Sequence, residues 1–210
     1  MSSLTRSPII MTHAMKAVII SLISAFMIFA PATAQLNQAQ AESFTKTLVT
    51  ELGAIAKNPS LNDDARERAY RGALQSRLAT DEIGKFLLKS VPAELPTQAQ
   101  IARYNQLFPT YIAASFAAQI GGLAERQINV TQSRTRGERD VIVRSELVNN
   151  RGVKKASIDW RIRWINGQPR LLDVLVERVS PLVTKRQEFS SLAKRQGMDA
   201  LLAHMQTVAN

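Results

Sequence analysis

The sequence predicts an α+β domain in which helices precede and follow a four-stranded antiparallel sheet. Hydrophobic residues repeat at three- and four-residue spacing over residues 38–123, as in amphipathic helices. Residues 125–179 instead alternate between apolar and polar side chains, as half-buried strands do. Residues 180–208 return to helical spacing. The order of these three patterns places helices at both ends of the sheet.

The expected helices are separated by residues that break or cap helices. Asn58-Pro59 should end the first helix, and Ser60 can cap the second. A short third helix and a long fourth helix follow. Pro109 should kink or split the fourth helix, and Gly121-Gly122 should end it. In the C-terminal segment, Gly197 should divide the helical pattern into two helices.

Four strands are expected to form a meander, with each strand pairing with the next. They are placed at residues 126–135, 138–149, 153–165 and 168–179. Asn149–Gly152 and Asn166-Gly167 are turn sequences, and an Asn-Gly pair is a strong hairpin signal. The third strand should carry its large apolar side chains on one face, namely Ala156, Ile158, Trp160, Ile162 and Trp164. Its other face is mainly basic, so the sheet should have one apolar and one basic face.

The first 34 residues have the three parts of a cleavable secretory signal. Arg6 and Lys16 supply positive charge, and residues 17–30 contain no charge. Ala32-Thr33-Ala34 is the small-x-small pattern of a cleavage site, which places the cut before Gln35. A retained membrane anchor is the alternative. The apolar run disfavours it, because 14 helical residues rise about 21 Å and the hydrocarbon core is about 30 Å thick.

Removal of residues 1–34 leaves one expected domain, 35–210, with a helical part at 35–123 and a part at 124–210 that holds the sheet and the last helices. Of the 27 basic residues 25 remain, with all 17 acidic residues, so the net charge is +8. Export excludes nucleic acid as the expected partner and leaves anionic lipid surfaces or acidic protein patches. A generally basic surface without a specific partner is the alternative. The chain has no cysteine, so neither disulfides nor thiolate chemistry can contribute.

Few residues in the expected domain suit catalysis. Its one histidine, His204, lies near the end of a helix, where a surface role is the ordinary interpretation. No nucleophile elbow, phosphate-binding loop or cluster of metal ligands is present in the sequence. Asp159 and Asp173 lie among apolar strand residues and could be bases with raised pKa values. Both alternate onto the polar face, however, so an ion pair or a loop-anchoring hydrogen bond is the preferred interpretation, with Arg161 and Arg163 beside Asp159.

The apolar face of the sheet and the helices could form one solid core, or they could be held apart around a cavity for an apolar ligand. The same residues serve both arrangements, so the pattern leaves both open. The residues expected to line such a cavity are Phe108, Tyr111, Ile112, Phe116, Ile128, Val130, Val141, Val143, Ile158, Trp160, Ile162, Val174 and Val176.

The C-terminal third resembles the Mla-type phospholipid-carrier family, also called the MlaC or toluene-tolerance family. Residues 171–180, LLDVLVERVS, are similar to the family's D-V-x-V-E-G-V/I-S strand. Residues 184–189, TKRQEF, are similar to its T/Y-R-x-x-F segment, and residues 197–205, GMDALLAHM, to its closing G-L-D-G-L-I-x-x-L. Arg178 stands where the family usually has glycine. A hopanoid-associated branch of the family is an alternative source of the likeness.

The resemblance implies an NTF2-like sheet, a helical subdomain and a periplasmic lipid shuttle without cofactor, metal or catalytic residue. Such a protein carries phospholipid, or a related lipid, between an outer-membrane lipoprotein complex and the lipid-binding subunit of an inner-membrane ABC transporter. Two alternatives remain. One is a ligand-free periplasmic adaptor that binds partners through its basic face. The other is an NTF2-like enzyme with Asp173 or Asp159 as its base.

Overall fold

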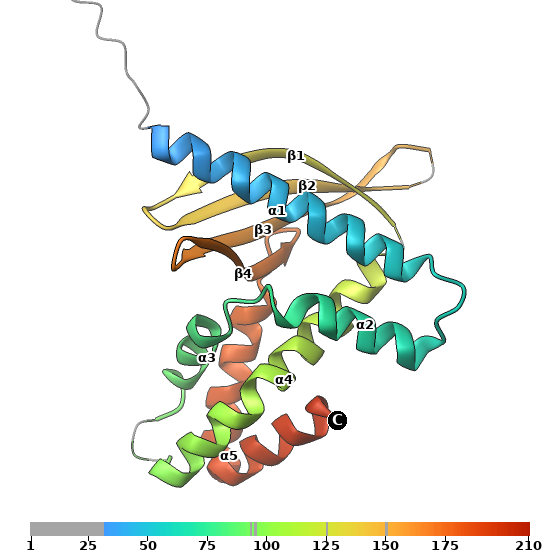
Figure 1. The fold of residues 1–210 in the computed structure, drawn as a ribbon. Coiled ribbons are helices and arrows are strands. Elements are labelled where there is room, and N and C mark those ends of the chain that lie inside the picture. The colour runs from blue at the N-terminus through green and yellow to red at the C-terminus, as the bar shows by residue number, and fades with distance from the viewer. Residues whose placement is uncertain (1–31, 93, 95, 125, 150) are drawn as a thin grey trace, which may run out of the picture. The chain divides into compact units, whose positions relative to one another are not determined.

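The computed structural model describes residues 32–92, 94, 96–124, 126–149 and 151–210. Their elements belong to one compact unit and follow the order α1 (Ala32–Ala56), α2 (Asp63–Gln75), α3 (Thr80–Leu88), α4 (Gln98–Ala124), β1 (Gln127–Arg136), β2 (Asp140–Val148), β3 (Lys154–Ile165), β4 (Gln168–Val176) and α5 (Pro181–Ala209) (Figure 1). The fold is α+β, as the alternating patterns predicted. The expected export segment lies outside the described residues, apart from residues 32–34 in the first turn of α1.

Helix α2 begins later than the sequence pattern predicted. Asn62 is its N-cap, and the Asn62 Oδ1 atom accepts a hydrogen bond from the backbone N–H of Ala65 at 2.9 Å. The prediction of Ser60 as the cap was therefore wrong. Ser60 instead donates its backbone N–H to Asn58 Oδ1 at 2.9 Å, which holds it in the turn after α1. Asn58 and Asn62 both suit these roles, since a short polar side chain can replace a missing backbone partner.

Helix α4 is continuous through both of its expected breakpoints. It contains Pro109 without being split, and it runs through Gly121-Gly122 to Ala124, so the prediction that these glycines end it was wrong. A Cβ atom at Gly121 would make an ordinary van der Waals contact, at 3.4 Å, with the ring of Tyr70 on α2. Helix α5 does break at Gly197, whose φ of 85° and ψ of 173° are non-helical, as predicted.

The four strands form an antiparallel sheet in the order β1-β2-β3-β4. Val143, Trp160 and Val174 are direct partners across β2, β3 and β4, so they share the apolar face. Asn166 and Gly167 have φ values of 51° and 75° and form the predicted turn between β3 and β4. A bulge between Arg161 and Ile162 pairs Ile162 with Leu171. It brings Leu171 into the core beside Leu172, which strict alternation did not predict.

The helices cover the apolar face of the sheet and continue beyond it as a helical group. Helix α1 packs along β1 and β2, whereas α4 packs against α2 and α5 (Figure 1). β4 is an edge strand, but its free edge is occupied by the segment between α2 and α3. Leu171 donates its N–H to Arg77 O at 2.7 Å, and Leu171 O accepts from the N–H of Ala79 at 2.8 Å. Among the described helices, none combines the length and apolar character that a bilayer span requires.

Candidate functional site

The residues predicted to line a cavity come together in the structure, but as a packed cluster. Ten of the thirteen are buried, and Ile128, Val130 and Val176 are half-buried. The ten belong to one hydrophobic core that spans the sheet and the helices, namely Phe108, Tyr111, Ile112, Phe116, Val141, Val143, Ile158, Trp160, Ile162 and Val174. Ile128 and Val130 pack against this core. We describe it as two walls, a sheet wall formed by the strand residues and a helix wall formed by the α4 residues.

Trp160 is the centre of the sheet wall. Its side chain is fully buried, and its indole Nε1–H donates a hydrogen bond to Ser145 Oγ at 2.7 Å. Ser145 pairs with Ile158 on the same face and is itself fully buried. Sequence reasoning missed Ser145, although its position two residues after Val143 places it on the inner face of β2. The buried indole requires such a partner, so Ser145 fixes the orientation of the ring.

Aromatic rings dominate the helix wall and join α4 to α5. The ring centroid of Phe189 on α5 lies 5.5 Å from that of Tyr111 and 6.3 Å from that of Tyr104. Tyr104 and Phe108 stack at 5.2 Å. Phe189 and Tyr104 were not among the predicted lining residues, although both have apolar helical spacing with them. Four large rings therefore meet where the two helices cross, and this is a favourable arrangement for aromatic side chains.

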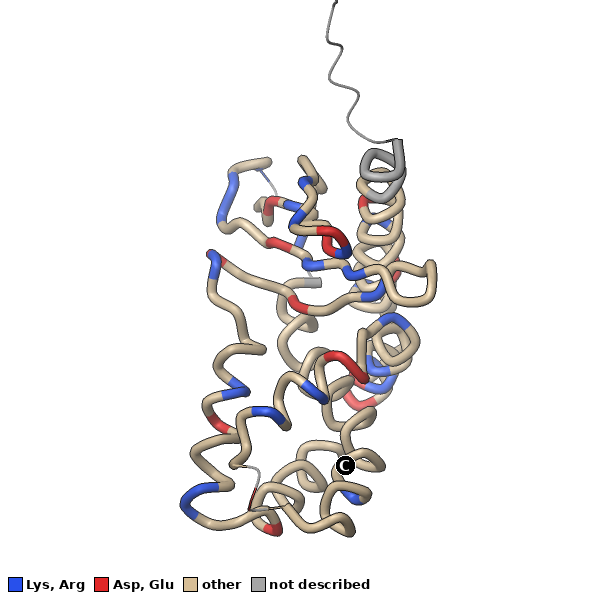
Figure 2. The backbone as a smooth tube through the Cα atoms, turned by 90° about the vertical axis from the view of Figure 1, so that its left-hand side faces the viewer, with Lys and Arg blue, Asp and Glu red and all other residues tan. Residues whose placement is uncertain are grey.

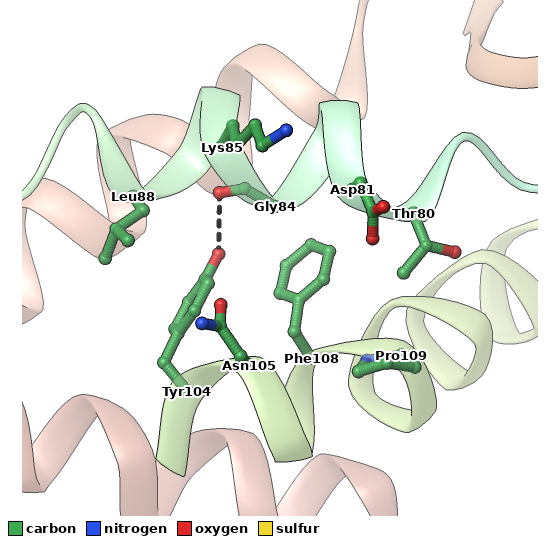
Figure 3. Close-up of a pocket in the computed structure, with 9 residues that line it drawn as sticks. All are labelled: Thr80, Asp81, Gly84, Lys85, Leu88, Tyr104, Asn105, Phe108 and Pro109. Carbon is green, nitrogen blue, oxygen red and sulfur yellow. Dashed lines mark hydrogen bonds between the residues drawn. The ribbon is translucent and has the colours of Figure 1, made fainter. Parts of the chain in front are cut away.

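A small pocket opens between α3 and α4 beside this cluster (Figure 3). Its volume is about 250 Å³, and Phe108 is the one predicted lining residue that it shares with the core. Tyr104 donates its hydroxyl to Gly84 O at 2.9 Å across the pocket (Figure 3). Burial raises the pKa of Tyr104, so the hydroxyl remains a donor. At Gly84, a Cβ atom would lie 3.1 Å from the Phe108 ring, so the glycine permits the close approach of α3 to α4.

The acids on the opposite sheet face form ion pairs. Arg144 donates from Nε and an Nη atom to Asp159 at 2.7 and 2.8 Å, and these hydrogen bonds hold the pKa of Asp159 below its usual range. The predicted ion pair is confirmed, but its partner is Arg144 and not Arg161 or Arg163. Those two arginines instead bind Asp140, at 2.5 to 2.7 Å for their closest contacts. Burial alone would raise the pKa of Asp140, but the two guanidinium groups lower it.

Asp173 anchors the start of α5. Its carboxylate accepts hydrogen bonds from Ser180 Oγ at 2.5 Å and from the backbone N–H of Val174 at 2.9 Å. Ser180 is the N-cap of α5, and its Oγ accepts from the N–H of Val183 at 3.1 Å. Burial raises the pKa of Asp173. The predicted loop-anchoring role is confirmed, since these bonds connect the carboxylate to the helix that follows β4.

The charge distribution is basic but largely interleaved with acids on the sheet. Figure 2 shows Lys and Arg residues on the strands and along α5, with acidic residues between them. On the face of the sheet that was predicted to be basic, Arg144, Arg161 and Arg163 are paired with buried carboxylates. Within the part of the chain that the structure describes, no group of three acidic or histidine residues could hold a metal ion. His204 is exposed, and its ring centroid lies 6.3 Å from that of Tyr111.

The described residues thus form a packed apolar core between sheet and helices, and the acids of the strands stabilise structure. A family model described as MlaC protein matches residues 42–207, and the chain belongs to this family. A solved structure of a phospholipid-binding protein from Ralstonia solanacearum, in complex with a phospholipid, has the same fold with a TM-score of 0.63. The two sequences are 18% identical, and the match covers 81% of this chain and 97% of the other. No curated protein matches the chain.

Proposed function

We propose that this protein is a periplasmic carrier that binds phospholipid, or a related lipid, and transfers it between an outer-membrane lipoprotein complex and an inner-membrane ABC transporter. Family membership over residues 42–207 is the observation that carries the proposal. The likeness to a phospholipid-bound structure supports it. The proposed acyl chains lie between the sheet wall and the helix wall, where sequence and structure both gather the largest apolar side chains.

A carrier of this kind needs neither catalysis nor a nucleotide. Two acyl chains of about 16 carbons represent on the order of 25 kcal/mol of transfer free energy, at about 0.8 kcal/mol per CH₂. Most of this cancels, because the lipid leaves one apolar environment and enters another. The direction of lipid transfer depends on the remaining difference in affinity between the carrier and its membrane partners, and a membrane partner can supply this difference.

Lipid binding in this proposal requires the two walls to separate. In the structure the predicted lining residues belong to one packed cluster, so acyl chains would replace protein–protein contacts with protein–lipid contacts. A long hydrogen bond of 3.4 Å, from Gln119 Nε2 on α4 to Val174 O on β4, joins the walls.

The test is to express the protein from the full-length gene, purify it from the periplasmic fraction, extract it with organic solvent and identify lipids by mass spectrometry. One phospholipid per protein is expected. If no lipid co-purifies and none transfers from vesicles with labelled phospholipid, the proposal is refuted.

A matched pair of variants connects occupancy to the site. Val130 is a half-buried residue of the predicted lining that packs against the core, whereas Val179 is 65% exposed. Val130→Glu should lower lipid occupancy strongly, because a carboxylate would face the acyl chains. Val179→Glu should leave occupancy unchanged. Thermal unfolding of both variants shows that the domain remains folded.

A ligand-free adaptor that docks through basic residues is the second candidate. The packed state of the ten buried lining residues favours it. The same extraction separates the two functions, since an adaptor would yield no lipid while still binding envelope proteins.

A further inference from the structure

A stripe of polar side chains runs along α4 inside the otherwise apolar core. Tyr111, Ser115 and Gln119 are spaced by four residues, so they lie on one face of the helix, one turn apart. The rest of this part of α4 is apolar, with Ile112 and Phe116 fully or almost fully buried. We call these three residues the α4 polar stripe.

Two hydroxyl groups of the stripe are buried without a hydrogen-bond partner among the residues that the structure describes. These are the hydroxyl of Tyr111, whose side chain is 0% exposed, and Oγ of Ser115. Such groups are rare in native proteins because burial removes their water and returns no hydrogen bond. A bound ligand, ion or water can supply the missing hydrogen bonds of such groups.

Tyr104 on the same helix shows that the fold can satisfy a buried tyrosine here. It is 1% exposed, and its hydroxyl donates to Gly84 O at 2.9 Å. Tyr111 lies two turns further along α4 and is equally buried, yet its hydroxyl lacks such an acceptor. The difference between the two tyrosines therefore comes from the surroundings of the polar stripe and not from general crowding of the helix.

Two basic side chains of the described residues lie beside the Tyr111 ring, those of Lys185 and His204, and the His204 ring centroid is 6.3 Å away. The Lys185 Nζ atom lies 5.4 Å from the centre of the Tyr111 ring. Its carboxylate contact, with Glu188, is long at 3.9 Å. At the other end of the stripe, Gln119 reaches Val174 O on β4. The stripe thus extends from a lysine near the start of α5 to the place where the two walls meet.

We infer that the α4 polar stripe is the subsite for the phosphodiester of a bound glycerophospholipid. Its oxygens would accept hydrogen bonds from the hydroxyls of Tyr111 and Ser115, and Lys185 would balance its negative charge. A phosphodiester suits these groups because it has several acceptors and no donor. The inference rests on the proposed lipid-binding function and reassigns Tyr111 from the acyl-chain lining to the phosphate of the lipid.

The experiment measures lipid binding by protein expressed from the full-length gene. The probes are phosphatidylcholine vesicles that contain either labelled phosphatidylglycerol or labelled diacylglycerol with the same acyl chains. Tyr111→Phe, Ser115→Ala and Lys185→Gln should each weaken binding of phosphatidylglycerol about two- to tenfold, the usual range for one hydrogen bond. Their binding of diacylglycerol should be unchanged, since this lipid has no phosphate.

Two matched controls accompany these variants. Thr110→Val removes an exposed hydroxyl from the same helix, and Lys194→Gln removes an exposed charge elsewhere on α5. Neither should alter binding of either lipid beyond the error of the measurement. Thermal unfolding without lipid should show Tyr111→Phe folded, because its lost hydroxyl has no protein partner to leave unpaired.

The outcomes separate this inference from the proposed function. If the wild-type protein binds phosphatidylglycerol and all three variants bind it equally well, the subsite is wrong while the carrier proposal stands. If the variants weaken the binding of both lipids equally, the hydroxyls bind water or stabilise the fold, and the inference is again overturned. If the wild-type protein binds neither lipid, both the inference and the carrier proposal fail.

Discussion

Replacing Arg178 by glycine should stabilise the protein, because this residue stands in a backbone conformation that suits glycine. Glu177 and Arg178 are the central residues of a tight turn after β4, with φ values of 49° and 67°. Val176 and Val179 close the turn with backbone hydrogen bonds in both directions, at 3.2 and 2.9 Å. Positive φ at both central residues defines a type I′ turn, for which Asn-Gly is preferred.

The magnitude follows from two opposing contributions. A left-handed conformation costs a residue with a side chain about 1–2 kcal/mol, whereas glycine loses about 0.5–1 kcal/mol more backbone entropy on folding. Arg178→Gly should therefore raise the free energy of unfolding by about 0.5–1 kcal/mol, which corresponds to about 1–4 °C in Tm for a domain of this size. Glu177 should stay as it is, because its carboxylate accepts from the N–H of Ser157 at 2.5 Å.

Urea unfolding of the wild type, Arg178→Gly and Arg178→Ala measures the effect. The alanine variant loses the same charge near Asp159 but keeps the strained φ, so it isolates the backbone contribution. It should not be stabilised. Equal stabilisation of both variants would show that charge and not strain matters, and a loss of stability in Arg178→Gly would refute the reasoning.

Three further substitutions test separate parts of the fold. Ser145→Ala should cost about 1–3 kcal/mol in urea unfolding by leaving the Trp160 N–H unpaired; an unchanged midpoint would contradict this. Burial raises the pKa of Asp173, so the wild type should gain stability relative to Asp173→Asn as the pH falls from 7 toward about 4, and a pH-independent difference in unfolding free energy would refute this. Gly84→Ala should be about 1–3 kcal/mol less stable than the helical control Gly72→Ala, which meets no atom within 4 Å; equal Tm values would exclude the proposed crowding.

Local patterns in the sequence were sufficient to predict most of the fold. Alternation identified all four strands, and the Asn166-Gly167 turn and the break at Gly197 have the positive φ values that their glycines suggested. The errors occurred where a residue had two possible roles. Gly121-Gly122 has the composition of a helix end, but glycine is also tolerated inside a helix, and α4 continues to Ala124.

The candidate site was predicted less completely, for a physical reason. Periodicity places an apolar side chain on an inner face, but it does not distinguish a solid core from a cavity that opens for a ligand. It also neglects polar residues on inner faces, which is why Ser145 and Ser115 were missed. Pairing between charges depends on strand register, so the pattern could predict that Asp159 is paired but not that Arg144 is its partner.

The strand-like contacts of residues 77–79 with Leu171 have a consequence for self-association. An uncovered edge strand is a template on which another chain can add a strand. Here the β4 edge is occupied by the chain's own linker, while β1 at the other edge has an irregular register around Thr131 and carries Arg134. By occupying this edge, the linker between α2 and α3 prevents another chain from adding a strand there. Its local opening, at temperatures below global melting, would expose the β4 edge and favour strand-mediated oligomers.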